Sequence, residues 1–273
     1  MVARTFLALV RATHPLPAVA VTVLVGVVTA VRGAEAATIG WVVASTAAGQ
    51  ASVGWSNDYL DRGRDAAAGR TDKPLVVGEV SARTVWIAAL LALPTSVLLS
   101  VPVGLPEATI MLIAMLAAWA YNLGLKSSAL SWLPYAVAFG LAPVYIWRAT
   151  GDWPPAWIVA GAALLGVGAH LLNVVPDLES DRAAELNGLP HRLGLRRSLF
   201  LACLILALTL GLVLAGAGTG PWSWLVAAVA AALIGAVAWA DLRGRTRLGF
   251  RLAVGAAAAI VAVLAVSPSR LGG

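Results

Sequence analysis

A long apolar run ends in the charged stretch Asn57-Asp58-Tyr59-Leu60-Asp61-Arg62-Gly63-Arg64-Asp65. A second apolar run, far along the chain, ends in Asn173-Val174-Val175-Pro176-Asp177-Leu178-Glu179-Ser180-Asp181. An aspartate at the centre of a membrane helix costs about 2.5 to 3.5 kcal/mol on insertion scales, so acidic residues that border apolar helices indicate a functional site. Two such clusters can converge on hard divalent cations, which in turn can hold a diphosphate.

The composition is that of a polytopic membrane protein. Of the 273 residues, 60% are hydrophobic and only 12% are charged, and the mean hydropathy is +0.87. A soluble domain of this length could not bury so much apolar surface, whereas lipid can cover it. The net charge of +6 does not indicate a nucleic-acid partner, because the basic residues lie in short loops between apolar runs. The single Cys203 excludes an intrachain disulfide.

We expect an all-α protein that forms one membrane-embedded domain over residues 1–273. A membrane span needs roughly 20 mostly apolar residues. Before the first span, residues 1–10 have no usual signal-peptide pattern and are interpreted as an interfacial segment. The predicted spans are nine, at 16–33, 37–57, 84–103, 107–122, 130–147, 156–175, 197–216, 221–241 and 249–267.

The charges of the loops predict the orientation of these spans. With the N-terminus in the cytoplasm, all 19 Lys and Arg residues except Arg32, Arg148 and Arg270 fall on the cytoplasmic side. We therefore expect a cytoplasmic membrane of the bacterial type, with the active-site loops inside and the C-terminus outside. Both acidic clusters then lie on the same side of the membrane and can share one site.

The spacing within each cluster predicts a metal-binding helix face. Asp58, Asp61 and Asp65 are three and four residues apart, and so are His170, Asn173, Asp177 and Asp181, apart from the interruption that Pro176 causes. Ligand sets made only of oxygen favour Mg²⁺ or Ca²⁺, and no cluster of Cys and His indicates zinc. One acidic run after a span is usually a solvated loop, but two runs on the same side favour a metal site. A weak internal repeat, spans 2–5 and 6–9, would relate the clusters.

Basic residues beside the clusters are candidates for holding phosphate oxygens. Arg70 and Lys73 follow the first cluster, Arg182 follows the second, and Lys126 closes the fourth span. Membrane orientation alone could account for such charges. That explanation is weakest for Lys126, which is the only charge in its loop.

The pattern Asn-Asp-x-x-Asp-x-x-x-Asp at 57–65, Asp-x-x-x-Asp at 177–181 and the Tyr121…Lys126 element resembles the UbiA superfamily of intramembrane prenyltransferases. The resemblance extends over nearly the whole chain. It implies a nine-helix bundle around a lipid-accessible central cavity, with two Mg²⁺ ions that bind an isoprenyl diphosphate. The acceptor patterns of the quinone-pathway members are not found here.

The resemblance also implies roles for individual residues. The expected metal ligands are Asn57, Asp58, Asp61, Asp65, Asp177 and Asp181. The expected substrate-binding residues are Arg70, Lys73, Lys126, Asn173 and Arg182. Asp58, Asp61, Asp177 and Tyr121 are the expected catalytic residues. Metal-assisted ionisation of the diphosphate would be followed by transfer of the prenyl group to an aromatic or lipid acceptor.

Other functions remain open at this point. A terpene cyclase of the same superfamily would use the same ionisation without an acceptor. A transporter would place charges near the middle of the membrane, whereas this chain places its acids at one edge. A non-catalytic lipid-binding protein would have no need for the full set of metal ligands.

Overall fold

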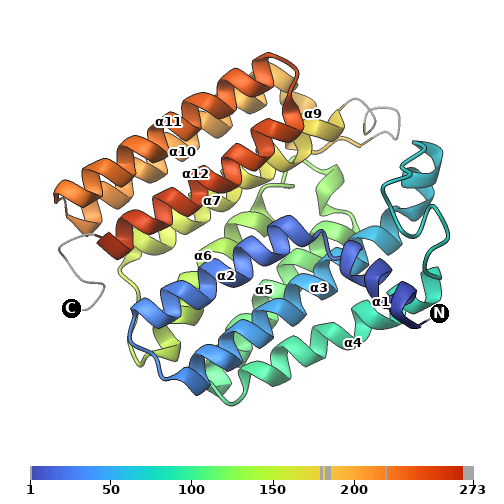
Figure 1. Ribbon diagram of the computed structural model, residues 1–273, viewed down its shortest axis with the longest axis horizontal. Coiled ribbons are helices and arrows are strands. Elements are labelled where there is room, and N and C mark those ends of the chain that lie inside the picture. Colours follow the sequence, from blue (N-terminus) through green and yellow to red (C-terminus); the bar gives the residue numbers. More distant parts are fainter. Residues whose placement is uncertain (1, 179–180, 182–185, 219, 267–273) are drawn as a thin grey trace. The chain divides into compact units, whose positions relative to one another are not determined.

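The computed structural model describes residues 2–178, 181, 186–218 and 220–266 (Figure 1). Every regular element in these ranges is a helix, which confirms the predicted all-α class. The chain divides into two compact units, which are described separately below. Unit 1 comprises Met1–Ala30 and Ala34–Gly124, and unit 2 comprises Val31–Gly33 and Leu125–Gly273.

Unit 1 contains five helices. They are α1 (Val2–Arg11), α2 (Pro15–Val31), α3 (Ala36–Ala67), α4 (Ala82–Ser100) and α5 (Leu105–Leu123). The longest, α3, packs against both α4 and α5. The first acidic cluster occupies its last turns, so the neighbours of α3 determine the surroundings of that cluster.

Small polar residues make up much of the buried face of α3. Ser52 Oγ donates to the Ala89 carbonyl of α4 over 2.9 Å and accepts from Trp119 Nε1 of α5 over 3.1 Å. Nearer the cluster, Asn122 Nδ2 of α5 lies 2.8 Å from Ser56 Oγ. Small side chains let helix backbones approach closely, and hydrogen bonds between helices fix their register where no water competes.

The N-terminal helix α1 lies beside the motif-bearing end of α3. Trp55 Nε1 donates to the Leu9 carbonyl of α1 over 2.8 Å. Ala8 is buried on the same side, while Phe6 and Leu7 are 67% and 60% exposed. Between α1 and α2 the chain bends by 73°. One face of α1 is thus packed on the protein, and its other face is apolar and exposed.

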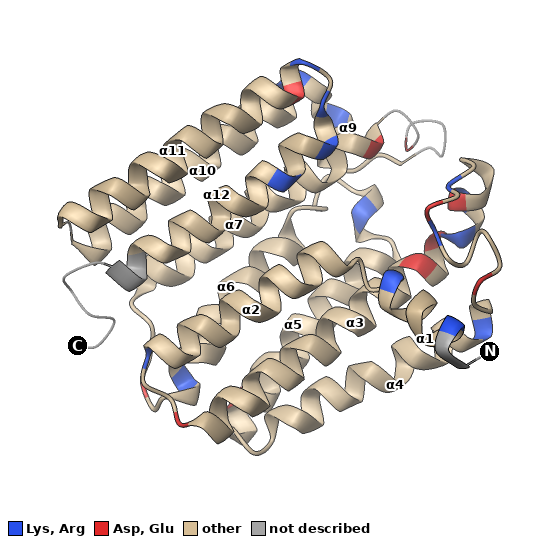
Figure 2. Cartoon of the chain, viewed as in Figure 1, with Lys and Arg blue, Asp and Glu red and all other residues tan. Residues whose placement is uncertain are grey.

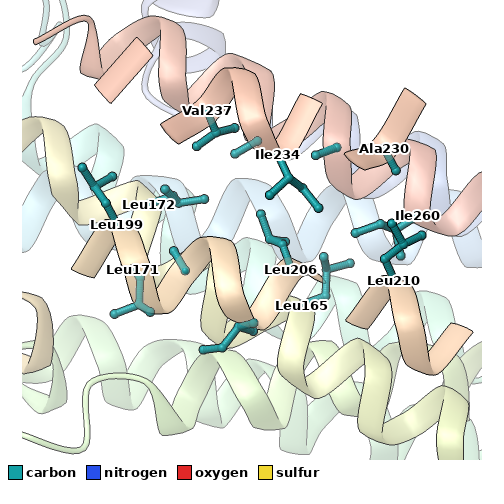
Figure 3. Packing of buried hydrophobic residues seen from close by; sticks show 14 of the residues in the cluster. Leu165, Leu171, Leu172, Leu199, Leu206, Leu210, Ala230, Ile234, Val237 and Ile260 are labelled. Atoms are coloured by element: carbon teal, nitrogen blue, oxygen red, sulfur yellow. The ribbon is translucent and has the colours of Figure 1, made fainter. Parts of the chain in front are cut away.

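Unit 2 contains the remaining elements. They are η1 (Leu125–Ser127), α6 (Leu133–Ala149), α7 (Ala156–Val174), η2 (Val175–Asp177), α9 (Leu189–Leu193), α10 (Leu195–Ala217), α11 (Pro221–Leu242) and α12 (Thr246–Val266). Their core is a continuous apolar cluster from α7, α10, α11 and α12 (Figure 3). Leu171, Leu206 and Ile260 are almost fully buried in it.

The helices correspond closely to the predicted spans. Within the described ranges, each of the nine predicted spans coincides with a helix of 17 or more residues. Six of these helices are long and apolar enough to cross a membrane, and a seventh crossing results if α1 and α2 together form one bent span. The helix α3 mixes Ser, Thr, Gly and Gln into its apolar sequence, and α2 and α6 are short. The predicted number of nine crossings is therefore not confirmed.

Close packing of α6 on α7 leads to a first prediction. A Cβ at Gly166 of α7 would lie 2.5 Å from the Tyr135 carbonyl and 2.8 Å from Phe139 Cβ, both in α6. Gly166→Ala should destabilise the protein by about 1–3 kcal/mol because the two helices must separate. The matched control is Gly211→Ala in α10, where nothing lies within 4 Å of the added atom. Thermal unfolding in detergent should show a lower apparent Tm for the first variant only; equal Tm values would contradict the packing argument.

Candidate active site

The last turns of α3 bring three residues of the first motif onto one side. Asn57 Nδ2 donates to Asp61 Oδ2 over 3.0 Å, and the Arg64 guanidinium pairs with the same carboxylate. Burial raises the pKa of the Asp65 carboxyl, and the charges of Asp61 and Asp58 raise it further, against the opposite effect of Lys73. The carboxylates of Asp58, Asp61 and Asp65 are thus close enough to influence one another. Figure 2 shows acidic residues at this end of α3.

Asp58 lies deeper than the rest of the motif. Its side chain is 2% exposed, and its Oδ1 lies 2.6 Å from Lys73 Nζ and 2.8 Å from His14 Nε2. Lys73 belongs to the loop that follows α3, and His14 lies between α1 and α2. The structure thus joins two residues that the sequence pattern predicts as metal ligand and phosphate ligand, and it adds a third residue that no motif includes.

The loop after α3 is held to α1 and to itself by charge. Arg11 Nη1 lies 2.6 Å from Glu79 Oε2, which joins α1 to the far end of the loop. Arg70 Nε and Nη2 donate to the two oxygens of Asp72 over 2.9 and 3.0 Å. The hydrogen bonds and charge of this guanidinium lower the pKa of Asp72 to about 2. Arg70 and Lys73 are consequently presented by an ordered loop.

A row of aromatic rings runs from Tyr59 of the first motif to α4 and α5. Tyr59 stacks on Trp86 with ring centroids 4.4 Å apart, and Trp86 contacts Trp119 at 5.7 Å. The guanidinium of Arg62 lies 4.2 Å above the Tyr59 ring. Tyr121, the predicted catalytic tyrosine, lies two residues further along α5 and is half-buried.

The second motif, in unit 2, starts where α7 ends. The helix stops at Val174 and continues as the short 3₁₀ turn η2, as expected for a chain that meets Pro176. Asn173 Nδ2 donates to the Tyr135 hydroxyl over 3.3 Å, and Asp177 closes η2. Asp181 Oδ2 lies 3.1 Å from His191 Nε2 of α9, whose side chain is 5% exposed. Arg182 lies outside the described residues.

A buried polar network supports the segment beyond the second motif. His170 Nε2 lies 3.0 Å from Ser131 Oγ, and the same hydroxyl accepts from the Leu189 amide over 2.9 Å. His170 is fully buried, which makes it a packed, hydrogen-bonded histidine. Lys126, in η1, is also buried, and a Cβ at Gly188 would collide with its carbonyl oxygen. The connection to α9 is thus tied to the start of unit 2.

The described residues contain no ready-made cluster of metal ligands, whether of the carboxylate or of the Cys and His type. Across the part of the chain that the structure describes, no three His, Cys, Asp or Glu side chains are grouped to hold a metal ion. What unit 1 does offer is one amide and two carboxylates on adjacent turns, from Asn57, Asp61 and Asp65. Mg²⁺ needs only one or two carboxylates when waters and substrate phosphates complete its coordination.

The chain is similar to known proteins over most of its length. The profile of the UbiA prenyltransferase family matches residues 19–250. The chain belongs to the UbiA prenyltransferase family. One curated relative, digeranylgeranylglyceryl phosphate synthase from Archaeoglobus fulgidus, is 29% identical over 160 residues, or 57% of this chain. The match covers 54% of that relative, about half its length.

Solved UbiA structures have the same fold. A UbiA homologue from Archaeoglobus fulgidus, bound to DMAPP and Mg²⁺, superposes with a TM-score of 0.71 at 18% identity, covering 94% of this chain and 99% of that one. A homologue from Aeropyrum pernix K1 gives 0.70 at 18% identity, with coverages of 95% and 97%. This likeness confirms the predicted fold. The family and the apolar helices together confirm an integral membrane protein.

Two histidines near the UbiA motifs were not among the predicted site residues. His14 contacts Asp58 from 44 residues away, and His191 contacts Asp181 from ten residues away. Neither has a sequence signal of its own, because each reaches its motif through the fold. In the sequence, His191 follows Pro190 after a polar stretch, and His14 ends a short basic segment. Neither pattern indicates a contact with a motif.

The Arg70–Asp72 pair gives a pH-dependent prediction. A carboxyl with a pKa of about 2 in the folded chain and about 3.9 when unfolded stabilises the fold above pH 4, and this contribution is lost as the pH falls to 2. Asp72→Asn should therefore lower the apparent Tm at pH 5 to 7 and have no effect near pH 2. The effect should be below about 1 kcal/mol, because Asp72 is 55% exposed. Arg70→Gln should abolish the same difference; a pH-independent gap would refute the assignment.

Proposed function

We propose that this protein is a Mg²⁺-dependent intramembrane prenyltransferase that ionises an isoprenyl diphosphate and transfers the prenyl group to an aromatic or lipid acceptor. The observation that carries the proposal is the oxygen face of α3 next to the ordered Arg70–Lys73 loop, in a chain of the UbiA family. The solved homologues bound to DMAPP or GPP together with Mg²⁺ support the choice of substrate and metal.

The ligand chemistry of the first motif suits Mg²⁺. Asn57, Asp61 and Asp65 offer only oxygen, and the raised pKa of Asp65 reflects burial and neighbouring negative charge that a cation would relieve. Asp177 and Asp181 would provide the second set of ligands. When bound, Mg²⁺ would neutralise the charge that develops on the leaving diphosphate.

The basic residues of the site would hold the diphosphate itself. Lys73 is 12% exposed and comes from the loop that Arg70 and Asp72 order. Together with Lys126 and Arg182, these cations would bind phosphate oxygens that the metal leaves open. Asn173, at the end of α7, would contribute a polar contact.

The prenyl chain and its acceptor would meet within the membrane region. Tyr121 would face the allylic cation, since an aromatic ring stabilises positive charge without reacting readily with it. The name of the curated relative favours a prenylated glyceryl phosphate as the first lipid acceptor to test. Loop charge supports an N-terminus and active-site loops in the cytoplasm of a bacterial-type cell and a C-terminus outside. The family match over residues 19–250 supports a single domain over 1–273.

A turnover assay on purified protein in detergent tests this function. Geranyl, farnesyl and geranylgeranyl diphosphates would be supplied with Mg²⁺, with and without aromatic and glyceryl phosphate acceptors, and both released diphosphate and organic products would be followed. We expect products that require acceptor and Mg²⁺ and that EDTA abolishes. Cyclic hydrocarbons or alcohols formed without acceptor would contradict the transfer step and identify a terpene cyclase.

Asp61→Asn provides the matching mutational test. It should lower turnover by about 100-fold or more, since a carboxylate next to the reacting diphosphate acts mainly on the transition state. The control is Glu35→Gln, an equivalent loss of charge at the opposite, exposed end of the same helix. Comparable losses in both variants would show that the effect is not specific to the motif.

The contact between His191 and Asp181 predicts a metal phenotype. Partners that orient a metal-binding carboxylate typically contribute about 10- to 100-fold to metal affinity or activity. His191→Phe should raise the Mg²⁺ concentration needed for half-maximal turnover by about tenfold, while His191→Gln, which keeps a hydrogen-bond donor, should retain more of the affinity. An unchanged Mg²⁺ requirement in His191→Phe would refute a role for this contact.

A further inference from the structure

Asp58, His14 and Lys73 form a compact polar cluster in unit 1. The Lys73 ammonium lies 2.6 Å from Asp58 Oδ1 and 3.2 Å from His14 Nε2, and His14 Nε2 lies 2.8 Å from the same Oδ1. The three residues come from α3, from the loop after it and from the turn between α1 and α2. Their side chains are 2%, 39% and 12% exposed for Asp58, His14 and Lys73 respectively.

The backbone around His14 is arranged to reach this cluster. His14 has a φ of 56°, a conformation that no other residue except glycine adopts in the described ranges. One helical turn before Asp58, Gly54 allows the Thr13 backbone to approach α3, because a Cβ there would lie 2.7 Å from the Thr13 carbonyl oxygen. A non-glycine residue persists at positive φ only where its surroundings require it. The surroundings here are the packing on Gly54 and the contact with Asp58.

These contacts distinguish Asp58 from the other acids of the motif. Its charge is already compensated by an ammonium at ion-pair distance, in a position almost inaccessible to solvent. A divalent cation at Asp58 would compete with Lys73 for the same oxygen and would leave a largely buried ammonium without its counter-charge, which is unfavourable. Asp61 also pairs with a cation, Arg64, but that pair is more accessible, with side chains 18% and 31% exposed, so Arg64 can stay in contact with solvent if a metal ion replaces it.

We propose that Asp58 and His14 are positioning residues that fix the Lys73 ammonium for the diphosphate, and that Asp58 is not a Mg²⁺ ligand. The proposal rests on the proposed function and changes the role that the sequence pattern predicts for Asp58. An ammonium group has three donors, so Lys73 can bond to Asp58 and still present donors to phosphate oxygens. Restricting a long side chain in advance lowers the entropy cost of binding.

The test separates metal binding from diphosphate binding without turnover. Mn²⁺ affinity would be measured alone by electron paramagnetic resonance. The affinity for geranyl S-thiolodiphosphate, which resists ionisation, would be measured by calorimetry at saturating Mg²⁺. The variants are Asp58→Asn, Lys73→Met, the double variant and Asp61→Asn, each checked for folding by size-exclusion chromatography in detergent.

We expect Asp58→Asn to keep Mn²⁺ affinity within about twofold, while Asp61→Asn loses about tenfold or more. The analogue should bind about tenfold more weakly to Asp58→Asn and to Lys73→Met. The double variant should be no weaker than Lys73→Met alone, because residues that act through one contact are not additive. It also removes both buried charges together, so it remains informative if Asp58→Asn alone fails to fold.

His14 provides an independent arm of the test, since it lies outside the motif. His14→Phe should weaken analogue binding without changing Mn²⁺ affinity, and His14→Gln should restore part of it through its amide. Two results would contradict this inference while leaving the proposed function intact. One is a loss of Mn²⁺ affinity in Asp58→Asn equal to that in Asp61→Asn, and the other is additive losses of analogue affinity in the double variant. If the wild-type protein bound neither Mn²⁺ nor the analogue, the proposed function would fall and this inference with it.

Discussion

Carboxylates at the end of a membrane helix must be neutralised, and unit 1 is organised around that requirement. The last turns of α3 carry Asp58, Asp61 and Asp65 within two turns, next to apolar surface where an unpaired charge is costly. Two of them acquire cations from the chain: Arg64 pairs with Asp61 and Lys73 with Asp58. Because Lys73 lies beyond the end of the helix, the loop has to turn back along α3 to deliver it. The ion pair is therefore one of the contacts that hold this loop against α3.

Close backbone approach is the second condition, and it depends on residues without large side chains. Gly54 lets the turn between α1 and α2 lie directly on α3, and Trp55, its neighbour, hydrogen-bonds to Leu9 and fixes α1 in the same place. Ser52 and Ser56 accept hydrogen bonds from α5 a turn away. A larger side chain at Gly54 would move His14 away from Asp58. The contact between His14 and Asp58 therefore depends on the close packing that small residues of α3 allow.

The helices and the motif face could be predicted because they depend on local pattern. Apolar runs of about 20 residues predict helices wherever lipid or protein covers them, and a spacing of three and four residues predicts a shared face. The contacts of His14 and His191 could not be predicted, since they depend on how distant segments pack. The predicted number of nine crossings is not confirmed by hydropathy, which identifies six such helices and one bent pair among the described residues. The helix α3 packs against α4 and α5, and the Ser, Thr and Gln residues in its sequence lower its hydropathy, so hydropathy alone does not decide whether α3 crosses the membrane.

The two histidine contacts differ in what they leave to a ligand. The contact between His191 and Asp181 is a hydrogen bond with an imidazole ring, which does not require a second charge beside the carboxylate. Asp58 is paired with an ammonium, so its charge is already compensated. Two aspartates that look equivalent in the sequence therefore have different surroundings: Asp181 contacts a histidine, and Asp58 holds a lysine of the protein. If Asp58 serves its lysine, as proposed above, the acids of the motif outnumber its metal ligands, because a polar network at the membrane edge also uses anions to keep its own lysines in place.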